Sequence, residues 1–339
     1  MKHNITFRTQ LIESVQDFCN KAGVAFLTKS INLVELIVLL ARYKEEGISL
    51  CPKVYITSSI NNIISMLPDS EHIKIGSSSY DIDGIKTVLK KSAPLATHGW
   101  LIYIQDSGSH LEYGLFRDSG NPISVLIDDI LMTSQNSTPI VKAFQIADEC
   151  VEVRANHGEY HYVFLNHRKE DSPAPLIYLE SLVKYITKNV DISVSEPTRS
   201  FLHKLFFDSF RQSHGCLISV INSNEIPPFL AKDSIILENP INFPELVKKL
   251  KQKEIESYVL DSKGVLLKGM LNSDGVIVFD NNGRLLGYNC FIEFENNGKV
   301  FGGARKRAYY FIREKIGNDI SAIFMQSRDG WTEFHGEEL

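Results

Sequence analysis

The chain has 339 residues, enough for two compact domains, and its 43% hydrophobic and 23% charged residues are ordinary for a soluble globular protein. A net charge of -5 argues against a dedicated DNA- or RNA-binding protein, but a small nucleotide needs only a few local donors for its phosphates. No apolar run is long enough to span a bilayer, Met1–Gln10 lacks the core of a secretory signal, and the five cysteines form no Cys-x-x-Cys pair. We therefore expect a cytoplasmic protein with reduced thiols and neither nucleic acid nor membrane as a partner.

The first 165 residues mix helices with short strands. A dense apolar run predicts a helix over Ile31–Tyr43, with Gly47 as its C-cap. A second helix, Ile82–Ala93, keeps its lysines on one side and stops before Pro94. The expected strands are Lys53–Thr57, His72–Ile75, Trp100–Gln105, Leu111–Arg117, Asp148–Arg154 and Tyr160–Leu165. This mixture indicates a separate α/β or α+β domain.

A linker is expected after this region, because Asn166–Pro175 is polar, charged and rich in proline. It would separate a domain at residues 1–168 from a second one at 176–339. A helix is predicted over Leu176–Asn189, and Pro197 is expected to open the next helix, which runs to Gln212. The elements expected after it are the strand Gly215–Ile221, the helix Phe243–Lys253, the strands Gly275–Asp280 and Arg284–Glu293 joined by an Asn281-Asn282-Gly283 hairpin, the helix Ala304–Lys315 and a final strand Ala322–Gln326.

A His-Gly pair borders a strand-like run three times, at His98-Gly99, His157-Gly158 and His214-Gly215. Glycine by itself is common where a strand begins. The residues around the three pairs do not recur at a fixed period, so coincidence is the better interpretation.

The first candidate for chemistry is Asp274-Gly275, which stands directly before the apolar run VIVFD. A carboxylate at a strand entrance can hold a divalent cation or accept a proton from a ribose hydroxyl, and Gly275 lets a ligand approach the backbone. Asp-Gly is also a common turn pair, so this feature is weak when taken alone.

A basic helix start is the second candidate. Gly302-Gly303 leads into Ala304, and Arg305, Lys306 and Arg307 follow in the first turn of the predicted helix. Cations are unfavourable at a helix N-terminus, which favours anions. A bound phosphate would reverse that penalty, because it would bond to the backbone amides and pair with the guanidinium groups. A solvated basic turn is the ordinary alternative.

The third candidate is Ser327-Arg328-Asp329-Gly330, which follows the last predicted strand. It places a hydroxyl and a carboxylate at the carboxyl end of a strand, where ligands often bind in α/β sheets. Without the other two candidates it would be read as a turn.

In this order, the segments resemble the diadenylate cyclase catalytic domain. That family has a Gly-Ala-Leu-Ile-Val strand, an Asp-Gly-Ala motif, a Gly-Thr-Arg-His-Arg-Ala motif and a Ser-Glu-Glu motif. The matching segments are Gly215-Cys216-Leu217-Ile218, Asp274-Gly275-Val276, Gly303-Ala304-Arg305-Lys306-Arg307-Ala308 and Ser327-Arg328-Asp329. The sequence departs from the family at Ser273 and Lys306, where the family has His, at Ala304, where it has Thr, and at Arg328, where it has Glu.

The resemblance implies a mixed β-sheet flanked by helices and one ATP site. Two such domains would face each other and condense two ATP into cyclic di-AMP and pyrophosphate, so the resemblance implies a homo-oligomer. Asp274 would be the catalytic residue and, with Asp329, would hold Mg²⁺ or Mn²⁺. The residues expected to bind the nucleotide are Gly275, Gly303, Ala304, Arg305, Lys306, Arg307 and Ser327.

Two classes of function stay open at this point. The retained Asp274, Arg305 and Arg307 favour an active cyclase, whereas Ala304 and Arg328 favour a catalytically degenerate sensor of a nucleotide or cyclic dinucleotide on the same fold. The region before about residue 165 carries no recognisable catalytic motif. It loosely resembles the sensor domains that precede such cyclase domains, so we expect it to be regulatory.

Overall fold

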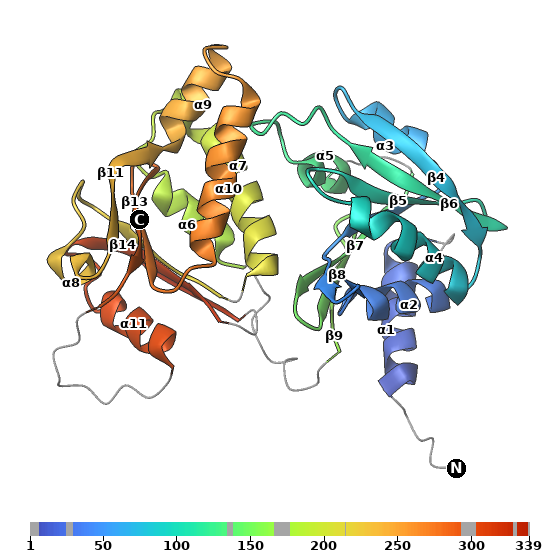
Figure 1. Cartoon of the computed structure of the whole chain (residues 1–339). Coiled ribbons are helices and arrows are strands. Elements are labelled where there is room, and N and C mark those ends of the chain that lie inside the picture. Colours follow the sequence, from blue (N-terminus) through green and yellow to red (C-terminus); the bar gives the residue numbers. More distant parts are fainter. Residues whose placement is uncertain are drawn as a thin grey trace. The chain divides into compact units, whose positions relative to one another are not determined.

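The computed structural model describes residues 7–24, 30–133, 138–165, 177–213, 215–292, 303–327 and 331–337. The chain divides into two compact units, Met1–Gly120 with Val125–Asp171, and Asn121–Ser124 with Ser172–Leu339 (Figure 1). Each unit holds a mixed β-sheet with helices against it, which confirms the α/β fold class. The proposed linker lies outside the described residues. No helix within the described ranges is both long and apolar enough to cross a membrane.

The first unit contains a seven-stranded sheet with the order β4-β6-β5-β3-β7-β8-β9, in which β3 and β5 run parallel. A two-stranded hairpin of β1 and β2 stands apart from it. The elements are α1 (Phe7–Lys21), α2 (Ser30–Leu40), β1 (Lys44–Glu45), β2 (Ile48–Ser49), β3 (Lys53–Thr57), α3 (Ile60–Met66), β4 (Glu71–Ser79), α4 (Ile82–Ser92), a 3₁₀ turn (Ala93–Leu95), β5 (Leu101–Asp106), β6 (His110–Arg117), α5 (Ile127–Thr133), β7 (Ile140–Ala147), β8 (Cys150–Ala155) and β9 (Tyr160–Phe164).

Each face of this sheet packs against its own helices. On one face α1, α2 and α4 contribute to a core with alternate residues of the central strands, such as Val54 and Ile102. On the other face α3 and α5 pack against residues of opposite parity, such as Tyr55 and Tyr103. This division follows from the two-residue period of a strand.

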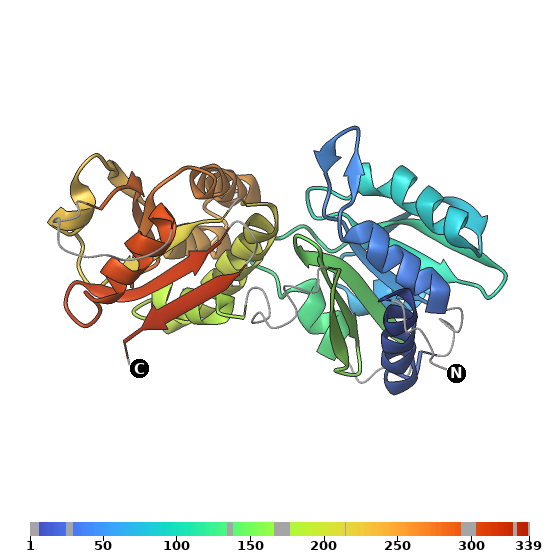
Figure 2. The same ribbon diagram turned by 90° about the horizontal axis from the view of Figure 1, so that it is seen from below.

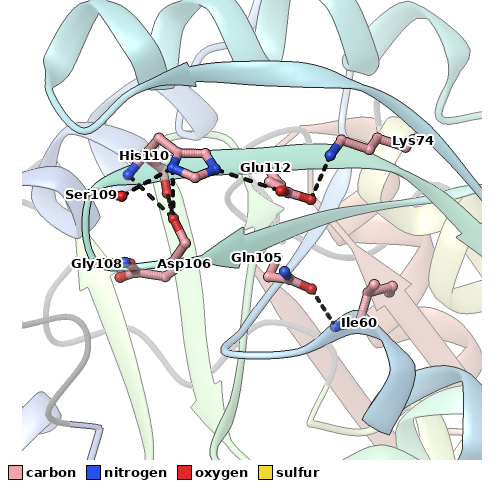
Figure 3. Close-up of polar contacts among 9 residues, drawn as sticks. Ile60, Lys74, Gln105, Asp106, Gly108, Ser109, His110 and Glu112 are labelled. Carbon is pink, nitrogen blue, oxygen red and sulfur yellow. Dashed lines mark hydrogen bonds and ion pairs between the residues drawn. The ribbon is translucent and has the colours of Figure 1, made fainter.

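The β5–β6 hairpin is held by polar contacts of its turn residues (Figure 3). Asp106, the last residue of β5, accepts a hydrogen bond of 2.7 Å from the Gly108 N–H. At the start of β6, His110 lies 3.5 Å from the carboxylate of Glu112. Glu112 also pairs at 2.8 Å with Lys74 of the edge strand β4. The turn and its neighbouring strand are therefore fixed by side chains as well as by the ladder.

The second unit contains a six-stranded sheet with the order β11-β13-β12-β10-β14-β15, in which β10 and β12 run parallel and the other neighbours are antiparallel. The elements are α6 (Leu179–Ile186), α7 (Ile192–Gln212), β10 (Leu217–Ile221), α8 (Pro228–Ala231), β11 (Ile235–Asn242), α9 (Phe243–Lys251), α10 (Ser257–Leu271), β12 (Val276–Asp280), β13 (Arg284–Cys290), α11 (Ala304–Arg313), β14 (Ile320–Gln326) and β15 (Thr332–Gly336). Helix α11 lies on one face of this sheet and α7 on the other (Figures 1 and 2).

Phenylalanine rings join the helices of the second unit to its sheet. Phe210 of α7 stacks on Phe324 of β14 with the ring centres 5.0 Å apart. Phe206 meets Phe279 of β12 edge-on at 5.9 Å, and Phe243 of α9 stacks on the same ring at 6.3 Å. All five rings are buried, so this face depends on apolar burial together with ring geometry. The opposite face buries Tyr309 and Ile312 of α11 against the alternate residues of the strands.

The predicted bounds of single helices and strands are confirmed where residues within or next to the segment determine them. Strand β3 matches its predicted bounds, and α4 and α9 begin where expected, because Asp81 and Asn242 cap them by accepting the N–H groups of Gly84 and Glu245. The prediction that Gly47 is the C-cap of the helix is wrong. The helix ends at Leu40, and Gly47 lies in the β1–β2 turn.

Two further expectations are corrected by the structure. Pro197 lies inside α7, because Asp191 caps the helix one turn earlier by accepting the Ser193 N–H at 2.8 Å. The predicted strand Ala322–Gln326 is confirmed as β14, which ends at Gln326, but it is not the final strand, since β15 follows it in a hairpin. The sequence analysis also predicts none of the elements α1, α3, α5, β7, α8, β11 and α10. The apolar residues of β7 and α10 are buried by tertiary packing.

The phenylalanine contacts generate a stability prediction. Phe210→Ala should lower the free energy of unfolding of the second unit by about 3–5 kcal/mol, because it removes a fully buried ring and leaves a cavity. Tyr258→Ala is the matched control, since Tyr258 is 69% exposed. In a Trp100→Phe background, Trp331 is the remaining tryptophan and its fluorescence follows the unfolding of its own unit in urea. Equal losses in both variants would contradict the packing.

Candidate functional site

The parallel pair at the centre of the second sheet places two of the sequence motifs at one edge. Strands β10 and β12 run side by side with Leu217 opposite Val276, so both strands begin at the same edge of the sheet. Gly215 stands just before the first strand, and Asp274-Gly275 just before the second. Segments about sixty residues apart in sequence are thereby brought to neighbouring strand entrances.

The end of β14 joins the same edge. This strand runs antiparallel to β10, so its last residues lie beside the first residues of β10. The Cys216 N–H donates to the Gln326 carbonyl at 3.1 Å, and the Gln326 N–H donates to the Cys216 carbonyl at 2.9 Å. Ser327, which comes next, therefore lies near Gly215, and a third motif meets the first two.

The start of α11 completes the group through Arg305. Gly215 has a left-handed φ of +93°, and a β-carbon at this position would lie 2.5 Å from Arg305 Nη1 and 2.5 Å from the Gln326 carbonyl oxygen. Non-bonded atoms do not approach so closely, so only glycine fits both the backbone conformation and the contact. The guanidinium of Arg305 thus lies against the backbone at the strand entrance.

The guanidinium of Arg305 also affects the pKa of the Cys216 thiol. Burial raises the pKa of Cys216 to about 12, and the nearby Arg305 opposes that rise. The thiol stays protonated at neutral pH, so Cys216 is a packing residue and not a nucleophile.

The first turn of α11 is cationic and carries no acidic residue. Its N-cap is Gly303, which has no side chain to accept the N–H groups that begin the helix. Arg305 is half-buried, whereas Gly303, Ala304, Lys306 and Arg307 are exposed. Lys306 Nζ lies 5.9 Å from the centre of the Tyr310 ring. The amide groups and the cations together form a surface suited to an anion.

Asp274 is exposed in the loop that enters β12. Its neighbour Gly275 has a left-handed φ of +89°, and a β-carbon there would lie 2.8 Å from the Asn289 carbonyl carbon of β13. The preceding Ser273 hydroxyl donates to the Met270 carbonyl at 2.6 Å, which fixes the end of α10. The carboxylate is therefore carried on a tightly packed backbone and faces solvent.

Ser327 closes the turn between β14 and β15. Its N–H donates to the Trp331 carbonyl at 2.8 Å, and its hydroxyl accepts the Trp331 N–H at 3.1 Å. Asp329, expected as a metal ligand, lies outside the described residues together with Arg328. Within the described ranges no group of three acidic, histidine or cysteine side chains is arranged to hold a metal. Asp274 supplies one exposed carboxylate here, a ligand type that Mg²⁺ and Mn²⁺ prefer.

Two contributors to this edge carry signals that the sequence interpretation missed. Gln326 is a polar residue at the end of an apolar strand, and its amide donates to the Phe210 carbonyl at 2.9 Å, while its Oε1 is buried with no hydrogen bond. Cys216 lies in the first matching motif, but no signal in the sequence places it beside Arg305. A separate hollow of about 300 Å³ lies at the far end of α11, lined by Tyr310, Arg313, Glu314 and His335, and includes none of the motif residues.

No family model matches this sequence, and no curated protein is detectably similar to it. The starts of β10, β12 and α11 and the end of β14 lie together at one edge of the second sheet, here called the motif edge.

The contact at Gly215 gives a prediction with an internal control. Gly317 has a similar left-handed φ of +88°, but no atom lies within 4 Å of its would-be β-carbon. Gly215→Ala and Gly317→Ala share a conformational cost of roughly 1–2 kcal/mol. Gly215→Ala should lose about 1–3 kcal/mol more in the free energy of unfolding, because the methyl group displaces Arg305 or the Gln326 backbone. Equal losses in urea denaturation would show that the contact is not made.

Proposed function

We propose that the second unit binds ATP at the motif edge and is a diadenylate cyclase, a nucleotidyltransferase that condenses two ATP into the second messenger cyclic di-AMP. The observation that carries the proposal is the position of Arg305, whose guanidinium lies on the backbone of Gly215 where β10 begins and β14 ends. Phosphoryl transfer requires groups that bind phosphate and a group that accepts a proton. The motif edge offers a cationic helix start, a glycine backbone and an exposed carboxylate for these roles.

The triphosphate would lie against the N-terminal end of α11. Its oxygens would accept hydrogen bonds from the backbone around Gly303 and Ala304 and would pair with Arg305, Lys306 and Arg307. The anion would offset the unfavourable position of these cations at the positive end of the helix. Gly275 and Ser327 would complete the pocket around the phosphates and ribose.

The carboxylate of Asp274 would take the proton from the 3′-hydroxyl of the bound ATP. The resulting 3′-oxygen attacks the α-phosphorus of the second ATP, a P–O bond forms, and pyrophosphate leaves with the electron pair of the broken bond. The same exchange in the opposite direction closes the ring and releases a second pyrophosphate. Each nucleotide supplies the nucleophile to the other, so two sites must face each other and the active species is a homo-oligomer.

A divalent cation would supply charge neutralisation at the phosphates. Asp274, with Asp329, would hold Mg²⁺ or Mn²⁺. We further propose that the protein is cytoplasmic and that its first unit, within residues 1–168, regulates the cyclase unit at 176–339.

A second candidate is a degenerate sensor that binds a nucleotide or cyclic dinucleotide without turning it over. The observation that favours it is the first turn of α11, where Ala304 provides no hydroxyl and Lys306 is exposed beside Tyr310. Wild-type protein that binds ATP but forms no product with Mg²⁺ or Mn²⁺ would support the sensor over the cyclase.

The proposed binding of the triphosphate by the arginines of α11 is tested by the double variant Arg305→Ala/Arg307→Ala. Charge-assisted hydrogen bonds contribute about 1.5–3 kcal/mol each, so the Kd for ATP should rise by at least tenfold. Arg313→Ala removes a cation from the last turn of the same helix and should leave the Kd nearly unchanged. Calorimetry on both variants makes the comparison, and an unchanged Kd in the double variant would remove the site.

The catalytic role is tested by Asp274→Asn. The amide is nearly isosteric and cannot accept the proton, so cyclic di-AMP formation should be lost while the Kd for ATP changes little. Asp261→Asn, an exposed aspartate on α10, serves as the control and should keep both properties. Product is measured by mass spectrometry at chain concentrations that populate oligomers. Full synthesis of product by the Asp274→Asn protein would exclude the assigned role.

A further inference from the structure

The two sheets have the same topology. If the strands of each sheet are numbered by their order along the chain, the second sheet reads 2-4-3-1-5-6 and the first reads 2-4-3-1-5-6-7. In both sheets strands 1 and 3 are parallel, and the other neighbours among the first six are antiparallel. The first sheet differs only by β9, which is added beyond its sixth strand.

The helices are inserted at the same points of the two sheets. A pair of helices precedes strand 1 in each unit, α1 and α2 in the first and α6 and α7 in the second. A short helix follows strand 1, one or two helices precede strand 3, and one helix precedes strand 5. The short helix and the helix before strand 5 share a sheet face in both units, as the cores of α3 with α5 and of α8 with α11 show.

Details of the connections also correspond. Strand 3 ends on an aspartate in each unit, Asp106 or Asp280, and each carboxylate accepts an N–H group of the following turn. Figure 3 shows the turn of the first unit. Strand 4 begins four residues later in both, with His110 or Arg284. A glycine with left-handed φ stands just before strand 3 as well, since Gly99 and Gly275 both have a φ of +89°.

The helix before strand 5 carries opposite charge in the two units. Its second residue is Arg305 in α11 and Asp128 in α5, and the next residues are Lys306 and Asp129. A helix N-terminus favours anions, so α5 supplies its own anions where α11 presents cations.

The side chain of Asp128 is already paired within its own unit. It accepts a hydrogen bond of 2.5 Å from the Tyr55 hydroxyl of β3 and forms an ion pair with Lys142 of β7. Burial alone would raise the pKa of Asp128, but Lys142 and Lys53 hold it below its usual range, so the group is a carboxylate at neutral pH. A phosphate brought to this helix start would meet a fixed negative charge.

We infer that the chain carries the nucleotide-binding fold twice, and that the first unit is a copy in which Asp128 occupies the place of Arg305 and excludes a triphosphate. The inference rests on the proposed function of the second unit. It follows that one chain binds one ATP, although it contains two copies of the fold. The two nucleotides that cyclisation needs must therefore come from two chains, and the first unit is a non-binding counterpart of the cyclase unit.

The test is calorimetry on the full chain with Mg²⁺ and an ATP analogue whose α–β bridging oxygen is carbon, which prevents turnover. We expect one analogue bound per chain. Hydrogen exchange with the analogue should show protection at residues 215–220, 274–278 and 303–310, and none at 52–57, 98–103 or 127–133. Asp129→Lys, an exposed change on α5, should alter neither result.

Reversing a charge on α11 tests which of the two copies of the fold binds the analogue. Arg305→Glu should abolish binding altogether, and Arg307→Glu, an exposed position, gives the same test if the first variant fails to fold. A second bound analogue, or binding that persists in these variants with protection at residues 127–133, would overturn the inference and leave the proposed function standing. Absence of binding by the wild-type chain would instead overturn the proposed function and this inference with it.

Discussion

The motif edge of the second unit depends on the packing of one glycine backbone against one arginine. Gly215 adopts a left-handed conformation beside the last residues of β14, and Arg305 lies where its side chain would be. This contact ties the start of α11 to the entrance of the central parallel strand. Once that tie is made, the register of β10 with β12 and β14 determines which other residues share the edge. The chemistry proposed for Asp274 and the triphosphate binding proposed for α11 both follow from this arrangement.

The electrostatics of helix starts distinguishes the two units more sharply than their folds do. In α5 the positive end of the helix faces Asp128, whose charge is balanced by Lys142 and a hydroxyl of the same unit. In α11 the same end carries cations next to an N-cap without a side chain, an arrangement that an anionic ligand would stabilise. Under the proposed function, the first unit keeps the fold without the ligand site, because six strands and their helices are stabilised by apolar burial, and the site by a few charges.

Sequence reasoning succeeded where a short segment determines its own structure. The one-sided lysines and Pro94 of the helix that begins at Ile82, the apolar run of β10 and the Asn281-Asn282-Gly283 turn were sufficient to predict their elements. It failed at the elements it did not predict, among them α1, α3, α5, β7, α8, β11 and α10, and at Pro197, where capping by Asp191 sets the helix start. The three His-Gly pairs lie at non-equivalent places in the two sheets, so they do not indicate the repeated topology. The two sheets share their strand order without sharing the residues at corresponding positions.

The sequence by itself determined the local features: the α/β class, the glycine and aspartate before a strand, the basic helix start and the serine after the last central strand. Their meeting at one sheet edge was decided by tertiary structure, because it requires a parallel pairing between segments about sixty residues apart and an antiparallel strand about a hundred residues from the first. The same is true of the contact between Gly215 and Arg305 and of the correspondence between the two sheets. Non-local hydrogen bonding and burial select these arrangements, and neither leaves a periodic signal in the sequence.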